Sequence, residues 1–196
     1  MVNVLDIVVD HDPLDYENKK GANIKKIKSN EGGWVNDPND RGGETNFGVS
    51  TKLLNSLHSQ GRWLGYKTVN DIPNDSAATA IFEKEFFRNN EINYGTNDIT
   101  LKMNDISVNV GGGNGTLIMQ RAINALHPQP VIKEDGGMGD NTRKAYGDAL
   151  AFFGQDALMK SLINQQKKWY TDIAAADTSQ ANFLQGWLTR ADYVPK

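Results

Sequence analysis

The sequence predicts a mainly α protein, an α+β fold in which helices dominate and one small β-hairpin interrupts them. Apolar residues recur at helical spacing over most of the chain. The exception is residues 32–51, where glycine, asparagine and aspartate crowd together as they do in tight turns. The chain has 196 residues, 38% of them apolar and 23% charged, which is enough to bury a full core in a globular protein. It contains no cysteine, so the fold cannot depend on disulfides.

The first predicted helix runs from about residue 14 to residue 31. Ile24 and Ile27 fall on one face of it, and Glu31 follows on roughly the same face. Gly32 and Gly33 then supply a helix stop. Beyond them, "NDPNDRGG" is dense in turn residues, and "TNFGVS" alternates like a short strand. We therefore expect a small hairpin or sheet within residues 34–51.

Helical patterns return after the hairpin. We expect one helix from residue 51 to about 62 and another over residues 76–90, with Ser76 as its N-cap. A buried helix is predicted over 100–110, and the glycine-rich "GGGNG" follows at 111–115. This run lacks the lysine of a phosphate-binding loop and follows no strand, so it predicts a hinge or a helix break.

The last part of the chain is also predicted to be helical. An amphipathic helix over 117–126 ends at Pro128, a long one covers 158–173, and "NFLQGWLTR" closes the chain. In "EDGGMGDNT", residues 134–142, the order of acidic residues is not that of a calcium-binding loop. We expect a turn there, with Asp140 or Asn141 capping the next helix.

Composition limits the classes of function. The formal net charge of −3 gives no electrostatic case for nucleic-acid binding, and the lysines between residues 19 and 28 are typical of a solvated helix face. No apolar run approaches the roughly 20 residues needed to span a bilayer. The opening "MVNVLDIVVDHD" has neither a basic start nor a cleavage site, so we expect cytoplasmic accumulation. The three histidines are scattered, and we predict no metal and no cofactor.

Glu31 and the turn residues after it are the candidate catalytic groups. At the end of a helix, the dipole and nearby apolar residues both disfavour a carboxylate, which predicts a raised pKa suited to a general acid. Asp37, Asp40 and Thr45 follow on the predicted hairpin. A proton donor facing a second carboxylate is the arrangement that cleaves glycosidic bonds. Considered alone, however, these residues also fit an exposed helix end followed by an ordinary loop.

The segment "EGGWVNDPNDRGGETNFGVS" closely resembles the signature of glycoside hydrolase family 108, the phage and bacterial N-acetylmuramidases. That signature reads E-G-G-x-x-N-x-P-x-D-x-G-G-x-T-x-x-G. Its fixed positions are all filled here, by Glu31, Gly32, Gly33, Asn36, Pro38, Asp40, Gly42, Gly43, Thr45 and Gly48. "NDISVNVG" and "MQRAIN" resemble the next helices of the family, and "DGGMGDNT" and "FLQGWLTR" resemble its predicted peptidoglycan-binding region.

The resemblance implies a lysozyme-like fold and a division of the chain. Residues 1–112 would form the catalytic lobe, with the active-site helix and hairpin at 24–51. Residues 113–196 would form a helical region resembling a peptidoglycan-binding domain, packed with the first into one bilobal unit. The spacing of Glu31, Asp40 and Thr45 is also similar to that of the T-even phage lysozymes.

The resemblance also implies roles for single residues. Glu31 would protonate the leaving oxygen, Asp40 would stabilise the oxocarbenium-like transition state or activate water, and Thr45 would position that water. Asp37 competes with Asp40 for the role of second carboxylate. Trp34 would stack on a sugar or pack the hairpin. Asp105 and Asn109 would face the cleft or form a hydrogen-bonded interior pair; the residues alone decide neither case.

The implied activity is hydrolysis of the β-1,4 bond between N-acetylmuramic acid and N-acetylglucosamine. The implied partners are peptidoglycan glycan strands, with no nucleic acid, no membrane insertion and a monomeric state. The best biological role is an endolysin that waits in the host cytoplasm and reaches the periplasmic peptidoglycan after a separate protein perforates the membrane. A lytic transglycosylase and a non-catalytic wall-binding module are the alternatives.

Overall fold

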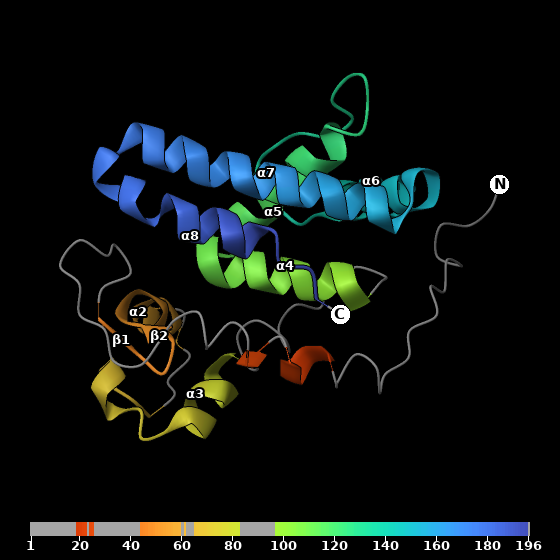
Figure 1. Ribbon diagram of the computed structural model, residues 1–196. Helices are drawn as coiled ribbons and strands as arrows, with labels where there is room; N and C mark the ends of the chain where they lie inside the picture. Colours follow the sequence, from red (N-terminus) through yellow and green to blue (C-terminus); the bar gives the residue numbers. More distant parts are fainter. Residues whose placement is uncertain are drawn as a thin grey trace. The chain divides into compact units, whose positions relative to one another are not determined.

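The computed structural model describes residues 19–22, 24–25, 44–59, 61, 65–82 and 97–195, and these are mainly helical with one small hairpin (Figure 1). The predicted fold class, mainly α with a small β-hairpin, is confirmed. The described residues fall into two compact units: residues 20–82 form one, and Lys19 with residues 97–195 forms the other.

The unit of residues 20–82 is built around the hairpin. Strand β1 (Thr45–Asn46) pairs antiparallel with β2 (Val49–Ser50), and helix α2 (Thr51–Ser59) follows directly. The 3-10 helix η2 (Val69–Asp71) and helix α3 (Asp75–Phe82) complete the described part of this unit. Residues 19–22 and 24–25 are also helical, as predicted.

The hairpin is tighter than the sequence pattern suggested. "TNFGVS" is not one strand, because Phe47 and Gly48 both adopt positive φ, at 48° and 80°, and turn the chain between two short strands. Two successive residues with positive φ form the turn whose twist matches that of a hairpin.

The predicted cap of α3 was wrong. Asn74 caps this helix, accepting a hydrogen bond from the Ala77 N–H at 3.0 Å, whereas Ser76 lies within its first turn.

The described residues of the second unit form a bundle of five α-helices. They are α4 (Asn97–Val110), α5 (Gly112–Asn124), α6 (Asp140–Phe153), α7 (Gln155–Ala176) and α8 (Ala181–Ala191), with the 3-10 helix η4 (Thr178–Gln180) before the last. Helix α7 packs along α5, α6 and α8, and α4 packs against α5 (Figure 1). The predicted helix break is confirmed at Gly111, whose φ is 86°.

Helix α5 begins inside the glycine run, earlier than the apolar pattern indicated. The reason is close packing against α4: a Cβ on Gly115 would lie 2.7 Å from Oγ of Ser107. Glycine weakens a helix by roughly 1 kcal/mol relative to alanine, but here it lets two helices approach.

The core beneath α4 and α5 is apolar and continuous. It is formed by residues of α4 to α7, among them Ile99, Met103, Ile106, Ile118, Ile123, Ala149, Leu158 and Leu162.

Helix α4 buries a polar face as well as its apolar one. Lys102 is 0% exposed, and its Nζ donates to the carbonyl oxygens of Ala191 and Tyr193, both at 2.8 Å. Three positions on, Asp105 forms an ion pair of 3.2 Å with Arg190 of α8. Because positions 102 and 105 are three apart and so lie on the same face of the helix, one side of α4 contacts residues 190–193.

The buried ammonium makes stability depend on pH. Burial lowers the pKa of Lys102 from 10.5 to about 8, although the nearby Asp105 carboxylate opposes the shift. Between about pH 8 and 10 the unfolded chain therefore binds more protons than the folded chain, so the free energy of unfolding rises with pH. We expect this rise, at most about 1.4 kcal/mol per pH unit, to disappear in Lys102→Met. Urea unfolding at pH 7 to 10 measures it. Parallel curves for the two proteins would contradict the assignment, since other titrating groups are common to both.

Candidate functional site

Four of the predicted site residues lie outside the described residues. These are Glu31, Trp34, Asp37 and Asp40. Their roles stay predictions. The structure does describe Thr45, Asp105 and Asn109, and it places the first in one compact unit and the other two in the other.

Thr45 lies on β1, opposite Ser50, and is 5% exposed. The residues on either side of it fix this strand. The Glu44 carbonyl accepts from the Thr51 N–H at 2.8 Å and from the Thr51 hydroxyl at 3.0 Å. The Asn46 side chain donates to the Val69 carbonyl oxygen at 3.0 Å and so ties the hairpin to η2. Thr45 is thus held on a rigid element, which is what a positioning residue requires.

Asp105 and Asn109 form hydrogen bonds inside the helical bundle. Asp105 is 1% exposed, and Oδ1 accepts from Nε of Arg190 at 3.2 Å. Asn109 is half-buried, and its Oδ1 accepts from the Tyr170 hydroxyl at 2.6 Å, while Tyr170 in turn accepts from Gln166 at 3.0 Å. Each of the two side chains thus hydrogen-bonds to a different partner within the helical unit. Substrate binding by them stays a prediction.

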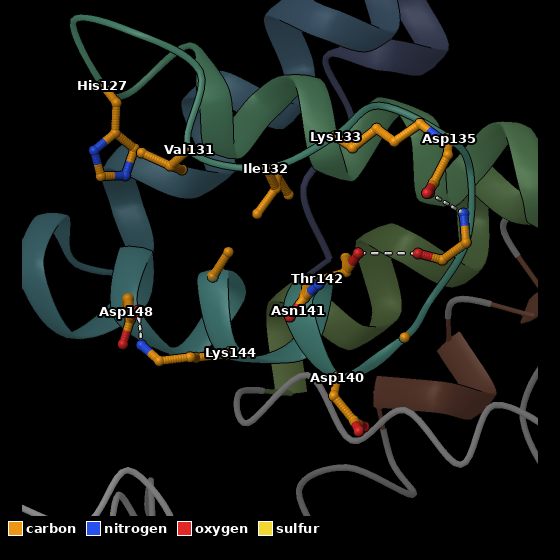
Figure 2. Close-up of a pocket in the computed structure, with 13 residues that line it drawn as sticks. His127, Val131, Ile132, Lys133, Asp135, Asp140, Asn141, Thr142, Lys144 and Asp148 are labelled. Carbon is orange, nitrogen blue, oxygen red and sulfur yellow. Dashed lines mark hydrogen bonds and ion pairs between the residues drawn. The ribbon is translucent and has the colours of Figure 1, made fainter.

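A pocket of about 970 Å³ opens in the helical unit, between the loop after α5 and the first turns of α6 (Figure 2). The loop contributes His127, Val131, Ile132 and Lys133, and α6 contributes residues between Asp140 and Asp148. Volumes of about 300–1,000 Å³ are typical of ligand sites, so this pocket is at the large end. The sequence pattern did not indicate it, because the loop and α6 form a cavity only when one folds back against the other.

One buried glutamine holds the loop wall of this pocket. The Gln120 side chain, on α5, is 0% exposed. Its Oε1 accepts from the backbone N–H groups of Asp135 and Gly136, at 2.9 and 2.8 Å. Its Nε2 lies within hydrogen-bond distance of Asp135 Oδ1, the Gly137 carbonyl and the Thr142 hydroxyl, at 2.9, 3.0 and 3.1 Å. A single side chain therefore bonds to several polar groups of one turn, and its own buried amide is fully hydrogen-bonded, as buried polar groups usually are.

Asn124, one helical turn further along α5, repeats the arrangement. Its Oδ1 accepts from the N–H groups of Val131 and Ile132, at 2.9 and 3.1 Å. Its Nδ2 donates to the Ile132 carbonyl oxygen and to Oε1 of Glu134, both at 3.0 Å. Gln120 and Asn124 lie four positions apart on one face of α5. Together they fix the loop at both ends of the segment 131–137. We call these two side chains, Gln120 and Asn124, the amide clamp.

The turn before α6 differs from the predicted cap. The residue preceding α6 is Gly139, which has no side chain to cap the helix, and Asp140 is the first helical residue. Asp135 closes the turn instead, accepting from the Gly137 N–H at 2.9 Å. Hydrogen bonds from Gln120 and from Gly137 lower the pKa of Asp135. Gly136 has a φ of 71°, and a Cβ there would lie 2.8 Å from the Gly113 carbonyl oxygen, so this position requires glycine.

The described residues contain no cluster of three or more side chains able to hold a metal ion. None of the described helices is both long and apolar enough to cross a membrane.

Comparison with known proteins places the two halves of the chain in families. Residues 24–111 match the glycosyl hydrolase 108 family, and residues 114–192 match a family described as a predicted peptidoglycan domain. The chain carries a glycosyl hydrolase 108 domain followed by a predicted peptidoglycan domain. It is therefore a glycoside hydrolase by family, and the resemblance seen in the sequence is confirmed.

A solved structure supports the fold. The structure of Brucella abortus SagA matches with a TM-score of 0.62 over 89% of this chain and 94% of that one, at 18% sequence identity. At that identity the match shows the fold alone. No curated protein sequence matches this chain. The pocket and the amide clamp lie within the predicted peptidoglycan domain.

We expect the amide clamp to depend on Gln120. Gln120→Leu keeps the size of the side chain but removes every hydrogen bond it makes to the loop, which should lower the free energy of unfolding by about 2–3 kcal/mol. The amide hydrogens of Asp135 and Gly136 should also exchange faster, because they lose their acceptor. Thermal unfolding and hydrogen exchange measure the two effects. Gln185→Leu, at an exposed position of α8, is the matched control. Unchanged exchange at both amides would show that Gln120 does not hold the loop.

Proposed function

We propose that this glycoside hydrolase cleaves the β-1,4 bond between N-acetylmuramic acid and N-acetylglucosamine in peptidoglycan. The family match over residues 24–111 carries the proposal, together with the filled motif from Glu31 to Gly48 inside it. The predicted peptidoglycan domain at 114–192 supports the choice of polymer.

In the proposed mechanism, Glu31 donates its proton to the glycosidic oxygen as the bond to the anomeric carbon breaks. Positive charge develops on the sugar ring, and the Asp40 carboxylate stabilises it or takes a proton from the attacking water. Water adds to the anomeric carbon, gives its proton to Asp40 or, where Asp40 only stabilises charge, to the Glu31 carboxylate, and leaves a reducing end. The Thr45 hydroxyl, on the rigid strand β1, orients that water. Asp37 remains the alternative second carboxylate, and Trp34 is proposed to stack on the substrate.

The biological role that we propose is that of an endolysin. The protein would accumulate in the host cytoplasm and act on the periplasmic wall once a separate protein perforates the membrane. The motif and the predicted peptidoglycan domain support a wall-degrading role.

A lytic transglycosylase is the second candidate activity. It would need only the acid, and it would form a 1,6-anhydro end without adding water. Asp40 and Thr45 favour hydrolysis, since a transglycosylase has no attacking water to orient.

The first prediction concerns Glu31. Wild-type protein should release muropeptides with reducing N-acetylmuramic acid ends from purified peptidoglycan, and Glu31→Gln should lower the rate by a factor of about 10²–10⁴, because general acid catalysis is lost. Mass analysis of the products measures both. Glu44→Gln is a matched control, because its amide oxygen can still accept from Asn70. Anhydro ends would assign the protein to the transglycosylases, and release at an equal rate by Glu31→Gln would remove Glu31 from the mechanism.

The second prediction concerns Thr45. Thr45→Val keeps the shape of this buried side chain but removes its hydroxyl, so kcat should fall by about tenfold or more while KM stays the same. Thr45→Ser, which restores the hydroxyl, should recover most of kcat. Initial rates on soluble glycan fragments, with circular dichroism to verify folding, measure the effect. Equal kcat in the three folded proteins would contradict water positioning by Thr45.

A further inference from the structure

The pocket of the helical unit combines apolar and polar walls. Val131, Ile132 and Ala145 supply aliphatic surface, and the His127 ring lies beside Val131 in Figure 2. Asn141 and Lys133 supply exposed hydrogen-bonding groups. This mixture suits a ligand whose surface is also mixed. An N-acetylated sugar presents hydroxyl and amide groups on its edges and apolar C–H and methyl groups elsewhere.

The charges that line the pocket are compensated within the protein. Lys144 forms an ion pair with Asp148 one helical turn away. Asp135 accepts from Gln120 and Gly137, and the Lys133 ammonium stabilises its charge further. Asp140 lies in the first turn of α6, where the helix dipole favours a carboxylate. A pocket without an uncompensated charge cluster favours a neutral polar ligand over the stem peptide of the cell wall, whose carboxylates are ionised.

The pocket is held in shape before any ligand arrives. The amide clamp fixes segment 131–137 to α5 through the buried side chains of Gln120 and Asn124. Thr142, at the start of α6, donates to the Gly137 carbonyl oxygen at 2.9 Å and joins the loop to the opposite wall. A rigid pocket loses little conformational entropy on binding, so it retains more of its contact energy as affinity.

Large apolar side chains are exposed at this pocket. Among the described residues the exposed large apolar side chains are Val131, at 51%, and Phe152, at 83%. Val131 lines the pocket, and Phe152 is joined to it through rings: His127 contacts Phe153 edge to face at 5.0 Å, and Phe153 contacts Phe152 at 4.9 Å. Exposed aromatic and aliphatic side chains beside a cavity are typical of a surface that a ligand covers.

We propose that this pocket binds the neutral N-acetylated glycan of peptidoglycan, with acetamido methyl groups on Val131 and Ile132 and sugar hydroxyls on Asn141 and Lys133. Its volume of about 970 Å³ accommodates more than one sugar ring. The proposal rests on the proposed function for the choice of polymer. It adds a second glycan site, formed by the loop after α5 and by α6, at which no bond is cleaved.

The test maps binding on the full chain carrying Glu31→Gln, so that the ligand stays intact. The probe is the β-1,4-linked tetrasaccharide of N-acetylglucosamine, which has the acetamido and hydroxyl groups of the wall glycan and no charge, added to ¹⁵N-labelled protein. Saturable shifts of the amide signals of residues 131–137 and 140–145 are the expected result. A free stem tetrapeptide is added in a parallel titration. Shifts in the pocket with the peptide and not with the tetrasaccharide would overturn the glycan assignment, and so would an unchanged pocket in both titrations.

Sedimentation with insoluble cell wall provides the second measurement. Val131→Asp and Asn141→Ala, both at exposed positions, should each weaken wall binding at least fivefold in the Glu31→Gln protein. Ala181→Asp adds the same charge as Val131→Asp at the exposed start of α8 and should bind like its parent. Equal binding by all four proteins would overturn the proposal. Because binding is measured without catalysis, failure of the hydrolase assignment would appear separately, as absence of products from the wild type.

Discussion

The helical unit depends on the way α4 satisfies its buried polar face. Lys102 and Asp105 lie in the interior and are matched by groups at the end of the chain: two carbonyls after α8 for the ammonium, and the Arg190 guanidinium for the carboxylate. Removing one partner of a buried ion pair costs about 3–5 kcal/mol, because it leaves the other charge buried without compensation. Helix α8 therefore cannot separate from α4 without a comparable loss of free energy. The opposite face of α4 meets the apolar core, so the helix is enclosed on both sides.

This enclosure joins the two matched families physically. Helix α4 belongs to the glycosyl hydrolase 108 match, which ends at residue 111, yet it packs in the same compact unit as α5 to α8 of the predicted peptidoglycan domain. Division of the chain at residue 112 would expose Ile99, Met103 and Ile106 to water and leave Lys102 without its acceptors. Each fully buried aliphatic side chain contributes roughly 1.5–3 kcal/mol. The family boundary in sequence is therefore not a boundary at which the fold can be cut without loss.

The helices were predictable from sequence because apolar periodicity extends over many residues, and local errors average out. The caps were not. Ser76 and Asp140 are good capping residue types, but Asn74 and Gly139 occupy the capping positions. These positions differ from the predicted ones by only one or two residues, and the packing of the helix start decides between such neighbours. The burial of Lys102 could not be predicted, since its acceptors are 89 and 91 positions away. The candidate catalytic residues came from a motif of local spacing. The pocket could not be predicted from such a motif, because it exists only when the loop after α5 folds against α6.

The two polar arrangements of this unit have different consequences for binding. On α4, the Asn109 amide oxygen accepts from Tyr170, and Asp105 accepts from Arg190, so both side chains serve the interior. On α5, Gln120 and Asn124 also form their hydrogen bonds within the protein, but they hold a loop whose side chains Val131 and Lys133 are exposed. Buried amides that organise exposed side chains are how a rigid fold presents a binding surface. The chemistry available to a ligand in this unit is thus concentrated on the loop wall and on the first turns of α6.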